Sequence, residues 1–254
     1  MKTMLTLLTL LNVAVNGGAQ QTFDRILLPI ATPNVPGAFG SLWMADAVVH
    51  NSDTVARVFD PDQRCVIPEG CPSAVPPGQT GHILFRGEPA ENPGLIMFVE
   101  HPSDLMTFES RVQDLSRQAL TWGTELPVVR EDAFVTRPIE LLNLPIDDRF
   151  RLMLRIYDID GRSDGRVRVS VYPFPGNGTS IGDVDLSLAP PSGFHPRYKP
   201  GYVQFSDIRG LIPAGRSETV IGVRITPFTS GLRLWAFISV TNNETQHVTT
   251  ITPQ

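Results

Sequence analysis

Proline and glycine recur along the whole chain, and their spacing limits what the chain can fold into. The 254-residue sequence has 23 prolines and 21 glycines. Proline lacks the backbone N–H that a helix interior needs, and glycine costs conformational entropy there, so long helices are disfavoured. The segments between these residues are short, and many alternate apolar with polar residues, which is typical of strands with one buried face. We therefore expect an all-β fold.

Three pairs of alternating segments predict β-hairpins, each with a polar turn between its strands. The last pair contains an unusual strand, residues 232–241, in which Trp235 and Phe237 lie on the face opposite Leu234 and Ala236. Two large rings on an outer face leave an exposed apolar patch, so something is expected to cover them. We expect the cover to be the long segment 174–201 or a neighbouring domain. The predicted hairpins pair 43–49 with 55–59, 150–157 with 167–171, and 232–241 with 247–252.

An internal repeat relates the first two predicted hairpins. At an offset of 109 residues, Pro29-Ile30 falls on Pro138-Ile139 and Trp43 falls on Leu152 in the same pleat phase. Residues 29–58 and 138–167 should then superpose. Gly94 and Gly231 each precede an apolar strand and extend the match at a wider offset. We infer two tandem β-sandwich domains, immunoglobulin-like or jelly-roll-like, at residues 22–125 and 126–254.

The N-terminus predicts export. Lys2 is followed by the apolar run 4–15 and by Gly17, Gly18 and Ala19, which is the pattern of a secretory signal peptide cleaved after residue 19. A membrane span needs about 20 apolar residues, so this run is too short to remain as one, and no later segment is long enough. The expected location is secreted or periplasmic, with no membrane span.

Charge and cysteine usage narrow the candidate partners. The net charge of −5 argues against nucleic acid and anionic membranes, so a glycan or a cell-surface protein is a better candidate partner. Cys65 and Cys71 lie in one loop rich in proline and glycine. An even number of cysteines in an exported chain predicts a disulfide between them, which would stiffen the loop.

A resemblance supports the same compartment and fold. The Trp43 segment, the stretch ESRVQDLSRQALTWGTELPVV and the terminal LWAFISVTNNETQHVTTITP resemble a group of uncharacterised exported bacterial proteins, chiefly from acidobacteria-like organisms. The resemblance covers nearly the whole mature chain and implies tandem β-sandwiches. It favours a strand over a helix for residues 106–112. It implies no activity and no catalytic residues.

One turn is a candidate calcium site. Asp158, Asp160 and Asp164 lie within seven residues of a loop that contains glycine, and carboxylate oxygens suit Ca²⁺. The EF-hand pattern would need an acid or amide at Arg162 and a later glutamate, and both are missing. The alternative is a solvated turn, because aspartate and glycine favour turns. Otherwise the sequence predicts no cofactor.

Exposed aromatic rings are the candidate ligand contacts, because β-sandwiches commonly bind sugars or peptides through such rings. For each of them, packing under a loop is the alternative. The candidates by pattern are Trp122, Tyr157, Tyr172, Tyr198 and Tyr202.

Two functions are consistent with these features. The first is an exported, non-catalytic surface, matrix or ligand-binding module, with a glycan as one candidate ligand. The sequence has no G-x-S-x-G or H-E-x-x-H motif that would indicate a hydrolase. The alternative is an extracellular hydrolase of glycans or peptides that uses paired carboxylates at strand ends. Its candidate acids are Glu100, Asp104, Asp147 and Asp148.

Overall fold

The chain is all-β, as the sequence predicts. The computed structural model describes residues 22–37, 40–60, 73–83, 85, 94–117, 122–176, 178–193 and 196–253. The predicted signal peptide, Cys65 and Cys71 lie outside these residues. Within the described ranges the helices are 3₁₀ turns of three or four residues, and none has the length or hydrophobicity to span a bilayer.

Two antiparallel sheets form the first sandwich. Sheet A has the order β10-β1-β7-β4-β5, and sheet B has the order β2-β3-β8-β9, with β6 paired to the other end of β3. Their facing side chains, among them Leu28, Val49 and Val99, form a buried core. The strands of sheet A are β1 (Phe23–Leu28), β4 (Arg57–Asp60), β5 (Ser73–Val75), β7 (Leu95–Glu100) and β10 (Val129–Arg130). Those of sheet B are β2 (Val35–Pro36), β3 (Leu42–Asn51), β6 (Thr80–Ile83), β8 (Met106–Asp114) and β9 (Thr124–Leu126).

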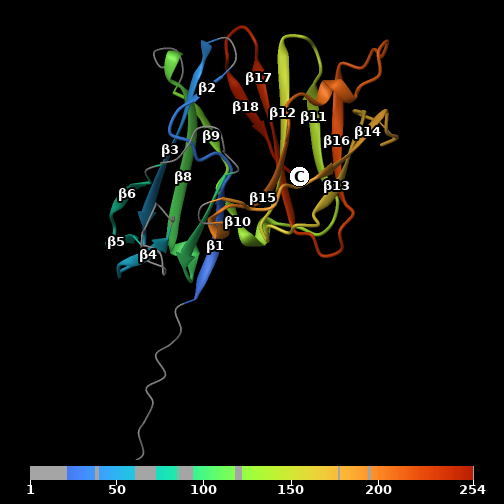
Figure 1. Ribbon diagram of the computed structural model, residues 1–254. Coiled ribbons are helices and arrows are strands. Elements are labelled where there is room, and N and C mark those ends of the chain that lie inside the picture. The colour runs from blue at the N-terminus through green and yellow to red at the C-terminus, as the bar shows by residue number, and fades with distance from the viewer. Residues whose placement is uncertain are drawn as a thin grey trace, which may run out of the picture.

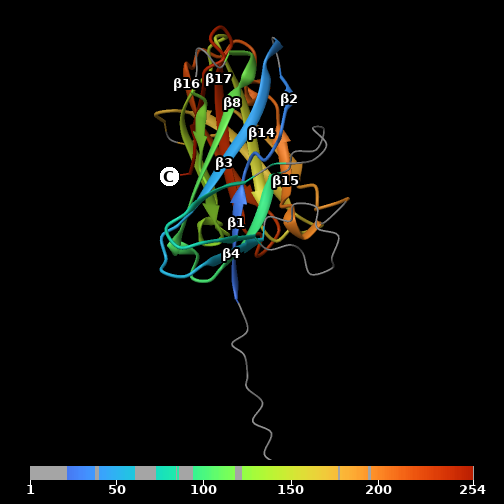
Figure 2. The same cartoon turned by 90° about the vertical axis from the view of Figure 1, so that its left-hand side faces the viewer.

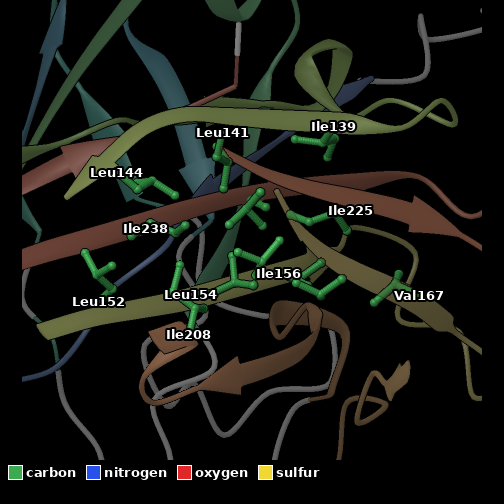
Figure 3. Packing of buried hydrophobic residues seen from close by; sticks show 14 of the residues in the cluster. Ile139, Leu141, Leu144, Leu152, Leu154, Ile156, Val167, Ile208, Ile225 and Ile238 are labelled. Carbon is green, nitrogen blue, oxygen red and sulfur yellow. The ribbon is translucent and has the colours of Figure 1, made fainter. Parts of the chain in front are cut away.

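The second sandwich is made of sheet C, with the order β15-β12-β17-β18, and sheet D, with the order β11-β16-β13-β14. Alternate residues of each strand point inward, so that Leu154, Ile225 and Ile238 meet in a fully buried core (Figure 3). The strands of sheet C are β12 (Phe150–Asp158), β15 (Gly201–Phe205), β17 (Leu234–Asn242) and β18 (Val248–Ile251). Those of sheet D are β11 (Ile139–Pro145), β13 (Arg166–Pro173), β14 (Gly182–Ser187) and β16 (Val220–Pro227).

The two sandwiches have the same strand connectivity. Six strand pairings of the first sandwich each have an equivalent in the second. In the first sandwich they are β1–β7, β4–β7, β4–β5, β3–β6, β3–β8 and β8–β9. Their equivalents, in the same order, are β11–β16, β13–β16, β13–β14, β12–β15, β12–β17 and β17–β18.

The first two predicted hairpins are wrong, and the third is confirmed. Strand β3 lies in sheet B while β4 lies in sheet A, and β12 lies in sheet C while β13 lies in sheet D. Each turn therefore crosses from one layer of the sandwich to the other. Alternation shows which face of a strand is buried, and it does not identify the neighbouring strand. Strands β17 and β18 do pair as a hairpin, and the strand expected at 106–112 is present as β8.

The 109-residue offset fails at the second strand of each unit. Trp43 is half-buried against a cluster shared with the second sandwich, whereas Leu152 is fully buried between its own two sheets. The offset also places Val58 on Val167, whereas the residue of β4 that lies in the hydrophobic core is Phe59. The connection 159–165 is longer than the connection 52–56, so one offset cannot align both strands. Gly94 and Gly231 also precede non-equivalent strands, β7 and β17. The first sandwich extends through β10 to Arg130, past the predicted boundary at residue 125.

The sandwiches lie side by side, with the outer face of sheet C against the first sandwich (Figures 1 and 2). Trp235 is 5% exposed and Phe237 is fully buried, and both belong to a cluster that includes Leu27, Ile96 and Val129 of sheet A. We call this cluster the interdomain core. The expectation that another part of the chain covers these two rings is confirmed, and the neighbouring sandwich is the principal cover.

Polar contacts join the sandwiches beside the interdomain core. Arg25 and Arg233 both bind Asp160 Oδ1, at 2.9 and 2.6 Å, and both bind Glu131 Oε1, at 2.6 and 2.9 Å. This four-residue network spans β1, the connecting segment and two turns of the second sandwich. The segment 174–201 contributes a further contact, because the Tyr198 hydroxyl donates a hydrogen bond to the buried Asp60 carboxylate at 2.6 Å. The two sandwiches therefore form one packed unit.

Candidate functional site

The outer face of sheet C is aromatic at one end and polar toward the other. At one end Tyr157 pairs with Trp235, and these rings pack in the interdomain core. Toward the other end Met153 pairs with Ser239 and Arg151 pairs with Thr241. Burying guanidinium groups under an apolar sheet would be costly, which explains why the interdomain core stops before it reaches this end.

A cleft of about 650 Å³ lies between the sandwiches where the interdomain core stops. In Figure 1, β1, β4 and β10 lie near the lower end of sheet B, while β2 and the upper halves of β3 and β8 stand beside sheet C. One wall of the cleft carries Trp43, Val112 and Leu126, and the other carries residues of β12, β15 and β17. A volume of about 300–1,000 Å³ is usual for small-ligand sites, so the size of this cleft suits a small ligand.

Two arginines give the cleft a positive charge. Arg155 is 8% exposed, and it donates hydrogen bonds to Gln204 Oε1 at 3.0 Å and to Pro29 O at 3.2 Å. Arg151 donates to Asn243 Oδ1 at 3.0 Å and to Gln246 Oε1 at 2.7 Å. These amide oxygens orient the two guanidinium groups.

Arg151 and Arg155 are the charged residues in the described part of the lining. The described residues that line the cleft include these two arginines and neither aspartate nor glutamate. Burial, and secondarily the positive charge of Arg117, lowers the pKa of Arg151. The charged groups of the described lining therefore both come from β12.

The opposite wall supplies an indole ring that a glycine holds in place. Gly37 lies against Trp43 so closely that a Cβ atom added at position 37 would lie 2.5 Å from the indole Nε1 and 2.4 Å from Ser41 Oγ. Only glycine leaves room for the ring at this position. Nearby, Thr32 lines the cleft, and its buried hydroxyl has no hydrogen-bond partner among the described residues. Buried polar atoms are usually satisfied, so this hydroxyl is an unused polar group in the wall.

Three of the five aromatic ligand candidates are packing residues. Tyr157 is fully buried, and its hydroxyl donates to Pro29 O at 2.7 Å. Tyr172 is buried and donates to a Glu140 carboxylate oxygen. Tyr198, also buried, donates to Asp60. Each ring is buried and its hydroxyl has a partner inside the fold, as is usual for buried tyrosines, so the prediction of ligand contact is corrected for all three.

The other two aromatic candidates differ from each other. Tyr202 is half-buried and lines the cleft. Trp122 is 83% exposed, and the lining of the cleft does not include it. The structure therefore brings only Tyr202 to the candidate site.

The predicted calcium ligands are used elsewhere. Asp158 is fully buried and accepts the backbone N–H groups of Asp160 and Arg162 at 3.0 and 2.7 Å. Asp160 belongs to the four-residue ion network, and Asp164 pairs with Arg162 at 3.0 Å. In the part of the chain that the structure describes, no group of three acidic, histidine or cysteine side chains is placed to hold a metal ion. The turn interpretation replaces the calcium interpretation.

The acids expected of a hydrolase do not meet in the cleft. Glu100 accepts the backbone N–H of Val58 at 3.0 Å, and Asp147 pairs with Arg149 at 2.7 Å. A smaller polar pocket contains Asp24 and Glu131. Burial raises the pKa of Asp24, but hydrogen bonds from Ser103 and His101 outweigh it and leave this pKa below its usual value. The hydrogen bond from Arg25 lowers the pKa of Glu131. A general acid needs a raised pKa, so neither Asp24 nor Glu131 is suited to that role.

The residues of the cleft were not singled out by motif. Trp43, Arg151 and Arg155 were recognised only as members of alternating strands, and Gln204 and Ser239 carried no signal of their own. One sequence signal could have indicated the cleft. On the outer face of residues 235–241, two aromatic residues are followed by two hydroxyl residues. Comparison with family models, curated proteins and solved structures gave no match.

Proposed function

We propose that the protein is an exported, non-catalytic ligand-binding module, and that the interdomain cleft is its binding site. The observation that carries this proposal is the cleft itself, which combines aromatic and hydrogen-bonding side chains from both sandwiches. A pocket with apolar walls and a few convergent polar groups is the usual form of a small-molecule site. The absence of acids from its described lining favours binding over carboxylate-based hydrolysis.

Export belongs to the same proposal. A signal peptide ending at residue 19, a Cys65–Cys71 disulfide and a secreted or periplasmic location all agree with a stable two-sandwich protein that works outside the cytoplasm. The matching connectivity of the sandwiches supports their origin as a tandem repeat. A glycan is the leading ligand class, and a cell-surface protein is the alternative partner.

A glycan and polysaccharide array tests this function. The purified protein is expected to bind a subset of the saccharides, and Trp43→Ala should abolish that binding because the indole forms one wall of the cleft. Trp122→Ala is the matched control, since that ring is 83% exposed and lies outside the lining. A thermal melt of each variant confirms folding.

Two results would contradict the proposal. One is retention of every interaction by folded Trp43→Ala protein, and the other is loss of binding in Trp122→Ala alone. Either result would move the binding site away from the cleft.

A further inference from the structure

We propose that Ser239 and Thr241 are the specificity-determining residues of the cleft, and that they bind two separate hydroxyl groups of a saccharide ring seated between the sandwiches. This inference rests on the proposed function and names the residues that recognise the ligand at the same site. It follows from two buried hydroxyls that have no hydrogen-bond partner within the described part of the chain.

The first step is the state of these two hydroxyls. Ser239 and Thr241 are each 6% exposed and contribute to the lining of the cleft. Neither hydroxyl makes a hydrogen bond to another described residue, and neither is fully covered, unlike the hydroxyl of Thr32. Buried polar groups usually have partners. Polar atoms of a ligand in the cleft would supply them.

The second step is the position of these side chains on the sheet. Ile238 lies in the core of the second sandwich, so Ser239 and Thr241 lie on the outer face of sheet C. Strand β17 pairs with β12 on one side and with β18 on the other, so its backbone groups are already used. Peptides that bind to sheets add to a free strand edge. This wall offers hydroxyl side chains instead, which suit a ligand rich in hydroxyls.

The third step is the spacing of the two residues. Alternate residues of a strand lie about 6.7 Å apart. Hydrogen bonds between oxygen atoms are about 2.5–3.0 Å long, so one ligand oxygen bonded to both hydroxyls would span about 6 Å at most. The two side chains are therefore best matched by two separate polar atoms. A saccharide ring carries several hydroxyls at different positions, whereas most apolar ring compounds do not.

The fourth step is the apolar part of the cleft. Trp43, Val112 and Leu126 form the wall that belongs to sheet B, and Met153 lies beside Ser239 on sheet C. Apolar walls of this kind bind the C–H faces of ring-shaped ligands. A wholly apolar ligand would cover the two hydroxyls and leave them without partners, which opposes its binding. A saccharide satisfies both walls.

Calorimetric titration of three variants tests the inference. The probes are cellotriose, maltotriose, mannotriose and any saccharide that the array identifies. Ser239→Ala and Thr241→Val should each weaken binding about three- to tenfold, the range for one hydrogen bond between neutral groups. Thr250→Val is the matched control and should change nothing, because Thr250 pairs with Ser239 on the neighbouring strand and lies outside the described lining.

Thermal melts of the same variants separate recognition from a structural role. Since neither hydroxyl has a partner among the described residues, replacing it by an apolar group should leave the Tm unchanged or raise it. Weaker binding without loss of stability is the expected combination. A fall of more than about 4 °C in the Tm of Ser239→Ala or Thr241→Val would show that the hydroxyl stabilises the fold, and would refute the inference.

The outcomes also separate this inference from the proposed function. If a saccharide binds and both folded variants keep the wild-type affinity, the roles of Ser239 and Thr241 are refuted while saccharide binding in the cleft stands. If the array and the titrations show no saccharide binding, the glycan form of the proposed function fails, and this inference fails with it. Tighter binding of cyclohexanol, a ring with a single hydroxyl, than of every saccharide would refute the requirement for two hydroxyls.

Discussion

Replacing Trp235 by alanine should destabilise the whole protein by about 3–5 kcal/mol, the range for truncating a buried large aromatic residue. The ring is 5% exposed and lies 6.0 Å from Tyr157 and 5.6 Å from Phe237, measured between ring centroids. Each aromatic pair contributes about 0.5–1.5 kcal/mol beyond burial, so losing both accounts for part of the total. The remainder comes from the lost contact with sheet A and from the cavity left behind.

The assay is guanidinium unfolding followed by far-ultraviolet circular dichroism, because removing a tryptophan alters fluorescence directly. Trp122→Ala is the matched control. That ring is 83% exposed, so its removal should change the unfolding free energy by less than about 0.5 kcal/mol. Since the interdomain core joins the two sandwiches, the wild type should unfold in a single transition, and Trp235→Ala should move its midpoint. A loss below about 1 kcal/mol for Trp235→Ala would refute the view that this ring stabilises the interface.

Three further substitutions test contacts of the interface and of the cleft. Tyr157→Phe removes the 2.7 Å bond to Pro29 O and should cost about 1–2 kcal/mol in the same unfolding assay; no change would mean that the hydroxyl adds nothing to the interface. Asp160→Asn should destabilise the protein at neutral pH, because arginine contacts, led by Arg233, lower the pKa of Asp160 to about 2. A lowered carboxyl pKa contributes stability that is lost as pH falls through the folded-state pKa. The difference in unfolding free energy between wild type and Asp160→Asn should therefore disappear between about pH 4 and pH 2. A difference that stays constant over this range would contradict the ion-pair explanation. Gly37→Ala should displace the indole of Trp43 and weaken ligand binding. Gly210→Ala is the control and should leave binding unchanged, because a Cβ atom at position 210 meets no atom within 4 Å. Equal ligand affinities of the two variants, measured by titration, would show that the indole position is unimportant.

The sequence predicted the fold class because proline, glycine and alternation act locally. The pleat of residues 150–157 identified Leu152 and Leu154 as core residues, and both are fully buried. The same pattern did not identify strand partners, so it placed β12 and β13 in one hairpin when they lie in different sheets. Partner choice depends on contacts far apart in the sequence, such as the nine-residue register between β12 and β17.

The candidate site was less predictable than the fold for a related reason. Prediction of ligand contacts from aromatic residue type included Tyr157 and Tyr198, but these rings are buried by contacts with the other sandwich. Arg151 and Arg155 lie on the polar face of the alternating strand 150–157, and alternation alone predicts that such a face is exposed to solvent. Only the docking of two sandwiches converts part of this wet face into a cleft wall.

The docking also explains how the cleft keeps its shape. Below the cleft, Phe237 and Trp235 are packed against sheet A, and the network of Arg25, Glu131, Asp160 and Arg233 closes the far end of the interface. Large, apolar interfaces hold domains in one arrangement, whereas small polar ones permit relative motion. The two walls are thus held in one arrangement, so binding at the proposed site should not incur the entropic cost of ordering them. The aromatic half of the sheet C face is what positions its cationic half, and both halves come from the same three strands.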